Sequence, residues 1–184
     1  MNTEVLMAGF GGQGMLLAGK VLAHAAMDCG LQVSWLPSYG PEMRGGTANV
    51  IVRISSEPIG SPLVTRPHGL LVMNLPSLEK FASRVKPGGL ILVNAALIDK
   101  EAGRDDCTVV KVDARGLAVE VSADRAANFV MLGAYVAATG VIPPENVAQA
   151  IADEFTGRKE KFVPGNRAAF LAGLTEGRKA EVPA

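Results

Sequence analysis

Three glycines with the spacing G-x-G-x-x-G constrain this chain most, in the segment Gly9-Phe10-Gly11-Gly12-Gln13-Gly14. The apolar run before them, over residues 4–9, predicts a buried strand, and residues 15–29, rich in Ala, Leu and Met, predict a helix ending at Gly30. In such a strand–turn–helix the first glycine permits a tight turn, the second lets an anionic ligand approach the backbone, and the third lets helix and strand pack closely. The start of the helix offers free N–H groups and a positive dipole end. We therefore predict a contact with a ligand or another subunit at Gly9, Gly11, Gly12, Gln13 and Gly14.

The rest of the chain alternates between strand and helix patterns. Strands are predicted at residues 32–36, ended by Pro37, and at 48–54, 69–74, 90–94 and 108–113, with 48–54 a candidate for antiparallel pairing. Helices are predicted at residues 76–85, 129–139, 143–155 and 166–178. This order predicts an α/β fold: a single Rossmann-like domain over residues 1–184, with a mostly parallel sheet and helices on both faces. Residues 180–184 are expected to fray.

Composition argues against several classes of function. The 184 residues carry 18 basic and 18 acidic side chains, a balance that gives no electrostatic footprint for nucleic acid and favours self-association or a protein partner. The sequence has neither a signal-peptide pattern nor the ~18 consecutive apolar residues of a membrane helix, so we expect a cytoplasmic location. Cys29 and Cys107 are too few for an iron–sulfur cluster, which takes about four thiolates. His24 and His68 stand apart from each other, so no metal site is expected.

A dinucleotide is one candidate ligand for the glycine loop, but a second feature that it requires is missing. An acidic residue should lie about 20 residues on, at the end of the second strand, where it binds a ribose hydroxyl. Residues 32–37 read Gln-Val-Ser-Trp-Leu-Pro, with neither an acid nor an arginine for a 2′-phosphate. This counts against NAD(P). An anionic group from a ligand or a partner, and a close-packed turn without any ligand, both remain open.

A charged, glycine-rich segment, residues 38–46, follows the second predicted strand and reads as a loop at the same sheet edge as the glycine loop. Arg44 could present its guanidinium to a carboxylate or phosphate, and Tyr39 offers an aromatic face and a hydroxyl. The alternative is a surface loop in which Glu42 and Arg44 form an exposed ion pair of little energetic value. The candidate contact residues of this segment are Ser38, Tyr39, Glu42, Arg44, Gly45 and Gly46. We find no G-x-S-x-G elbow and no P-loop, so no catalytic residue is predicted.

Together these segments resemble a known family. Residues 9–14 and 37–46 are similar to the two motifs of the γ subunit of 2-oxoacid:ferredoxin oxidoreductases, a domain also found fused in pyruvate:ferredoxin oxidoreductases. The resemblance continues through residues 54–62, and Asn128 with Leu132-Gly133-Ala134 is similar to the family's late helix. It thus covers most of residues 4–140.

The resemblance implies a role in a larger enzyme. Such complexes oxidatively decarboxylate a 2-oxoacid, transfer the acyl group to coenzyme A and pass electrons to ferredoxin. Thiamine diphosphate, with Mg²⁺, lies between the α and β subunits, and iron–sulfur clusters belong to other subunits, including a ferredoxin-like one. The γ subunit would contact the catalytic pair and the coenzyme A path, bind no cofactor of its own, and be inactive alone, where it could form a homodimer.

Residues 35–37 and 42–44 look closest to members that use 2-oxoglutarate or branched-chain oxoacids, so 2-oxoglutarate is the expected substrate. Two alternatives are a free-standing nicotinamide- or flavin-binding protein and a non-catalytic module that binds coenzyme A or another anion.

Overall fold

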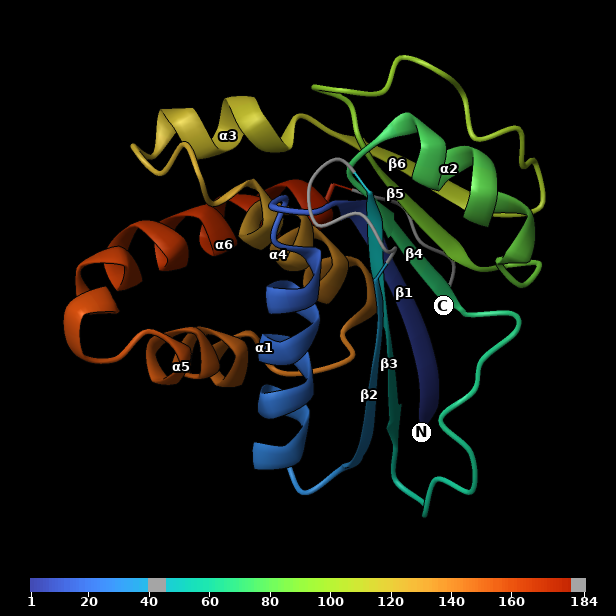
Figure 1. The fold of residues 1–184 in the computed structure, drawn as a ribbon, viewed down its shortest axis with the longest axis horizontal. Coiled ribbons are helices and arrows are strands. Elements are labelled where there is room, and N and C mark those ends of the chain that lie inside the picture. The colour runs from blue at the N-terminus through green and yellow to red at the C-terminus, as the bar shows by residue number, and fades with distance from the viewer. Residues whose placement is uncertain (40–45, 180–184) are drawn as a thin grey trace.

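The computed structural model describes residues 1–39 and 46–179, which form the expected α/β fold (Figure 1). Its strands are β1 (Asn2–Phe10), β2 (Gln32–Tyr39), β3 (Thr47–Ser55), β4 (Gly69–Val72), β5 (Leu90–Asn94) and β6 (Thr108–Val112). Its helices are α1 (Met15–Asp28), α2 (Leu75–Phe81), α3 (Ala114–Glu120), α4 (Ala127–Thr139), α5 (Pro144–Glu154) and α6 (Val163–Gly177), with short 3-10 helices η1 (Ala82–Arg84) and η2 (Gly157–Phe162). The predicted tail, residues 180–184, lies outside the described residues.

The sheet has the strand order β2-β3-β1-β4-β5-β6. Neighbouring pairs among β1, β4, β5 and β6 are parallel, whereas β3 runs antiparallel to both β1 and β2. The register pairs Phe10 with Thr47 and Tyr39 with Ala48. The end of β1, the end of β2 and the start of β3 therefore meet at one edge of the sheet.

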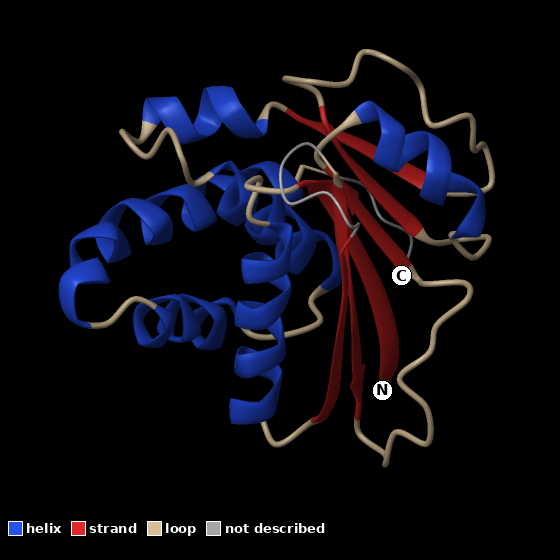
Figure 2. Cartoon of the chain, in the orientation of Figure 1, coloured by secondary structure: helices blue, strands red, loops and turns tan. Residues whose placement is uncertain are grey.

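Helices cover both faces of the sheet, as predicted, but unequally (Figure 2). Alternate residues of β1 divide between two cores: Val5 and Met7 face a large core shared with α1, α3, α4, α5 and α6. Leu6 and Ala8 face a smaller core beneath α2 and η1. This division follows from the period of two along a strand, and it buries β1 on both faces over residues 4–9.

Helices α4 and α6 pack closely enough to require glycine at the contact. A Cβ atom at Gly133 would overlap the backbone oxygen of Phe170, and one at Gly173 would overlap that of Val130. Tyr135, on the same helix as Gly133, is 1% exposed, and this burial raises the pKa of its hydroxyl to about 12. The α4–α6 pair thus forms a closely packed layer behind the sheet.

The second strand is longer than predicted. Pro37 does not end β2, which continues through Ser38 to Tyr39 and pairs with β3 along its length. The prediction was wrong because β2 lies at the edge of the sheet and pairs with a neighbour on one side only. An edge strand tolerates proline, which has no N–H group to donate. Ser38 and Tyr39 are consequently strand residues, and not part of a loop.

Two helices also differ from the prediction. Helix α3 was not predicted; it has only seven residues, and the side chain of Asp113 caps it by accepting a hydrogen bond from the Gly116 N–H at 2.8 Å. Helix α6 begins at Val163, three residues before the predicted start, with Pro164 in its first turn. Within residues 1–39 and 46–179, no helix combines the length and the apolar character needed to cross a membrane.

Candidate functional site at the glycine loop

The glycines of the loop have roles that differ from those of a dinucleotide fingerprint. Gly9 still belongs to β1, where a Cβ atom would lie 2.7 Å from Oε1 of Gln13. Gly12 and Gly14 have φ angles of +94° and +75°, so these two positions make the turn. A Cβ atom at Gly14 would lie 2.7 Å from Nδ2 of Asn128, so this glycine accommodates α4 and not a neighbouring strand.

Gln13 fastens the loop to the end of β4. Its Oε1 accepts hydrogen bonds from the Phe10 N–H at 2.6 Å and from Nδ2 of Asn74 at 3.3 Å, and its Nε2 donates to the Met73 carbonyl at 3.3 Å. Asn74 is buried, and its Oδ1 also caps α2 by accepting from the Ser77 N–H at 2.9 Å. The Gln13 amide, predicted as a ligand or subunit contact, therefore makes its hydrogen bonds within the protein.

Asn128 fastens the other end of the loop. Its Nδ2 donates to the Gly14 carbonyl at 3.1 Å, and the residue is 4% exposed. Sequence reasoning named Asn128 only through the family resemblance and did not single out Asn74. The signal for Asn74 was an asparagine two residues before Pro76, a pattern typical of a helix N-cap. Buried amides from α2 and α4 thus hold the loop in place, which preorganises it.

A cavity of about 480 Å³ lies beside the loop, between the start of α1 and the start of β3. Its lining is Phe10, Gly11, Gly12, Gly14, Met15, Leu16, Leu17, Tyr39, Gly46, Thr47 and Ala48. The Gly11 N–H donates to the Gly46 carbonyl at 3.1 Å, so the two predicted segments are in direct contact. Tyr39 is 68% exposed and presents its ring to this side of the sheet.

Five of the predicted contact residues line this cavity: Gly11, Gly12, Gly14, Tyr39 and Gly46. Ser38 does not, because side chains alternate along β2 and its own points to the face opposite Tyr39. Glu42, Arg44 and Gly45 lie outside the described residues.

The described residues around the cavity offer groups that can bind a ligand. Helix α1 begins there with no side-chain cap and no acidic residue in its first turn, so its positive dipole end faces the cavity uncompensated by a described side chain. The other lining groups are backbone, apolar side chains, one hydroxyl and the phenol of Tyr39. Among the residues that the structure describes, the groups with shifted pKa values lie elsewhere; for example, the hydrogen bond from Arg104 lowers the pKa of Asp106.

One cluster at a distance from the loop has ligand-like spacing. His24 and Asp28, one turn apart on α1, lie with Asp153 of α5 so that their ligand atoms are within 4.8 Å of one another. His24 Nε2 is 3.7 Å from an Asp28 carboxylate oxygen, and both aspartates are exposed. Sequence spacing did not reveal this group because α5 is far along the chain.

Comparison with known proteins gives a consistent match. A family model described as pyruvate ferredoxin/flavodoxin oxidoreductase matches residues 4–176. The 2-oxoglutarate synthase subunit KorC of Methanocaldococcus jannaschii is 36% identical over 177 residues, covering 94% of this chain and 92% of that protein. The γ subunit of a keto/oxoacid ferredoxin oxidoreductase from Geobacter sulfurreducens PCA superposes with a TM-score of 0.83 at 33% identity, covering 97% of this chain and 99% of the other.

A further relative shows that the same domain occurs within longer chains. The ketoisovalerate oxidoreductase subunit VorA of Methanothermobacter marburgensis is 42% identical over 180 residues, which are 97% of this chain but only 37% of that protein. The chain thus spans little over a third of this relative. Family, fold and the two glycine-containing segments agree: the chain belongs to the pyruvate ferredoxin/flavodoxin oxidoreductase family and is similar to the γ subunits of 2-oxoacid:ferredoxin oxidoreductases.

Proposed function

We propose that this chain is the γ component of an enzyme that oxidatively decarboxylates a 2-oxoacid, transfers the acyl group to coenzyme A and passes the electrons to ferredoxin. The observation that carries the proposal is the preorganised glycine-loop cavity. Its described lining offers backbone and side-chain groups that can bind and orient a ligand. Full-length similarity to a γ subunit and to KorC supports the same division of labour. In this proposal the chain positions a ligand and a partner, and the chemistry belongs to other subunits.

The cavity would contact the anionic part of coenzyme A or a catalytic subunit. Its fit to an anion rests on the uncapped start of α1 and on the close backbone of the loop at Gly11 and Gly12. The partners are α and β subunits that bind thiamine diphosphate and Mg²⁺, and a ferredoxin-like subunit with iron–sulfur clusters. The complex would work in the cytoplasm.

We favour 2-oxoglutarate as the substrate. Residues 35–37 and 42–44 support it, as does the KorC relative, which is named for 2-oxoglutarate. The VorA relative is named for ketoisovalerate, so branched-chain oxoacids are the natural competitors.

Purification of the tagged chain from its native cells tests the proposal. Mass spectrometry should identify thiamine-dependent subunits in the same fraction, and this fraction should reduce a viologen dye with 2-oxoglutarate and coenzyme A faster than with pyruvate or 2-oxoisovalerate. A different oxoacid preference would overturn the substrate alone. Viologen reduction by the recombinant chain by itself would overturn the division of labour.

The fold argues against a free-standing nicotinamide enzyme. In a dinucleotide-binding domain the second strand lies beside the first, and its end carries the acid that binds the ribose. Here β3 separates β2 from β1, which moves the end of β2 outward by one strand spacing of about 4.8 Å. A thermal-shift comparison of NADH with coenzyme A on the isolated chain distinguishes a nicotinamide enzyme from the proposed γ component. Stabilisation by NADH alone would favour the nicotinamide enzyme.

A further inference from the structure

Side chains of the kind that bind metal ions meet where α5 lies against α1 (Figure 1). His24 and Asp28 belong to α1, and Asp153 lies near the end of α5. Because His24 and Asp28 are four positions apart, their side chains share one face of the helix. The sequence predicts no metal site, since its two histidines stand apart, but the fold places two carboxylates beside one of them.

The spacing of these groups is close to that of a tetrahedral metal site. Zn²⁺ binds imidazole nitrogen and carboxylate oxygen at about 2.0–2.2 Å, which sets neighbouring ligand atoms about 3.4 Å apart. His24 Nε2 is 3.7 Å from a carboxylate oxygen of Asp28, slightly more than this distance. No separation within the cluster exceeds 4.8 Å, and because both aspartates are exposed, rotation of their side chains can close the remainder.

The charges of the cluster favour a cation. Among the described residues, neither Asp28 nor Asp153 forms an ion pair with a lysine or arginine. Lys20, one turn before His24 on α1, pairs instead with Glu154 at 2.8 Å. Two carboxylates this close repel each other, and a divalent cation between them would replace the repulsion with attraction.

A neighbouring amide orients one of the carboxylates. Gln149, one turn before Asp153 on α5, donates a hydrogen bond from its Nε2 to Asp153 Oδ1 at 2.9 Å. This contact restrains the carboxylate and leaves Oδ2 for an ion, as outer contacts do for metal ligands in other proteins. One imidazole with two carboxylates favours a transition metal over Mg²⁺ or Ca²⁺, which prefer sites made of oxygen alone.

We propose that His24, Asp28 and Asp153 bind a divalent transition-metal ion such as Zn²⁺, which joins α1 to α5. Three protein ligands leave a coordination position for water at the surface. The site lies about 14–20 Å along α1 from the glycine loop, at the helical rise of about 1.5 Å per residue. It shares no residue with the cavity at that loop, so the inference does not rest on the proposed function.

Calorimetric titration of the isolated full chain with zinc chloride, after removal of any purification tag, tests the site. The wild type should bind Zn²⁺ at least about ten-fold more tightly than Mg²⁺. His24→Ala and Asp153→Asn should each weaken Zn²⁺ binding by about ten-fold or more, because each removes a direct ligand and even outer contacts contribute at this level. The His24 side chain is 42% exposed and Asp153 is exposed, so neither substitution opens the core.

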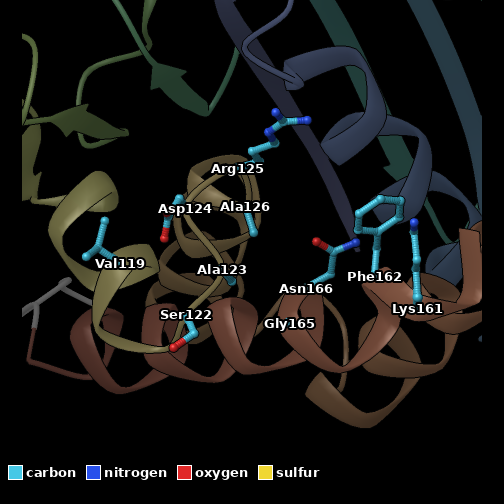
Figure 3. A pocket seen from close by; sticks show the side chains of 10 residues that line it. All are labelled: Val119, Ser122, Ala123, Asp124, Arg125, Ala126, Lys161, Phe162, Gly165 and Asn166. Atoms are coloured by element: carbon cyan, nitrogen blue, oxygen red, sulfur yellow. The ribbon is translucent and has the colours of Figure 1, made fainter.

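Asp124→Asn is the matched control for Asp153→Asn. Asp124 is exposed on the segment before α4 and does not belong to the cluster (Figure 3). Both substitutions remove one surface carboxylate, but Asp124→Asn should change the Zn²⁺ affinity by less than about two-fold, because salt screens a charge outside the site. Equal affinities of the two variants would overturn the proposal, as would a folded wild-type chain that binds no Zn²⁺.

Cys29 follows Asp28 in the chain and offers a thiol as a competing ligand. Cys29→Ala should leave the Zn²⁺ affinity unchanged. Loss of binding in this variant, with binding retained in His24→Ala, would assign the ion to the thiol and contradict the proposal. Zn²⁺ should also raise the midpoint of thermal unfolding of the wild type but not of His24→Ala, because the ion binds the folded chain. None of these measurements needs other subunits, so the site and the proposed function can fail separately.

Discussion

The two left-handed glycines of the loop allow a test of how α4 holds it. Gly12 and Gly14 both have positive φ angles, but a Cβ atom at Gly12 would meet nothing within 4 Å, whereas one at Gly14 would lie 2.7 Å from Nδ2 of Asn128. Alanine in the left-handed conformation costs about 1–2 kcal/mol. We therefore expect Gly12→Ala to lower the free energy of unfolding by about that amount.

Gly14→Ala should cost more, because the new methyl group also displaces the Asn128 amide from the Gly14 carbonyl. A lost intramolecular hydrogen bond adds about 1 kcal/mol, for a total of about 2–3 kcal/mol. Asn128→Ala alone should cost about 2 kcal/mol, since it leaves a carbonyl without its partner and a space behind. The double variant Gly14→Ala/Asn128→Ala should then be about 1 kcal/mol less destabilised than the sum of the single variants, because the methyl group enters the vacated space.

Urea unfolding of the isolated chain, followed by circular dichroism, measures the free energy of unfolding of the wild type and of the four variants. Gly12→Ala is the control for backbone strain alone. The reasoning would be refuted if Gly14→Ala were no more destabilising than Gly12→Ala, or if the double variant were additive within about 0.5 kcal/mol.

Three further predictions concern the rest of the fold. Gly173→Ala should destabilise the chain by about 3 kcal/mol because its methyl group overlaps the backbone of α4. Gly165→Ala on the same helix meets only the methyl carbon of Ala123 at 3.4 Å and should be neutral or slightly stabilising. Thermal unfolding of both variants compares the two effects. Tyr135 keeps its proton to a pKa of about 12 in the folded state against 10 when unfolded, so its contribution is complete below pH 10 and is lost as the pH rises toward 12. In Tyr135→Phe the free energy of unfolding should therefore fall by about 2–3 kcal/mol less between pH 10 and 12 than in the wild type. Urea titrations at each pH measure this fall, and the same fall in both proteins would exclude Tyr135 as its cause. Glu4 is 6% exposed and its carboxylate contacts Lys86 at 3.1 Å as well as His68, so Glu4→Gln should cost about 2 kcal/mol in urea unfolding at pH 7, and a neutral result would remove this network as a stabilising element.

Local patterns in the sequence predicted most of the elements. The glycine loop, α1 with Gly30 after it, and the buried strands β4 and β5 follow from apolar periodicity and from glycine and proline, which act over a few residues. The same local rule failed at Pro37, because whether proline ends a strand depends on the strand's place in the sheet.

The arrangement of the site could not be predicted in the same way. The insertion of β3 between β1 and β2 is a long-range pairing that no local pattern specifies. The amide contacts that hold the loop join Gln13 to Asn74 and Gly14 to Asn128, which are 61 and 114 positions apart. The cluster of metal ligands on α1 and α5 likewise became visible only with the fold.

The proposed contact between the glycine-loop cavity and coenzyme A can be tested through Tyr39, whose exposed ring lines that cavity without supporting the core. Tyr39→Ala should raise the KM for coenzyme A in the purified complex while leaving the KM for the oxoacid unchanged. Equal changes in both constants would point to a general defect of assembly.

The central claim is that this chain completes a 2-oxoacid:ferredoxin oxidoreductase without performing its chemistry. The most direct measurement is coenzyme A-dependent reduction of ferredoxin by the other subunits, expressed together with and without this chain. The account predicts full activity only when the chain is present, and no activity from the chain alone. Undiminished coenzyme A-dependent turnover in its absence would contradict the account.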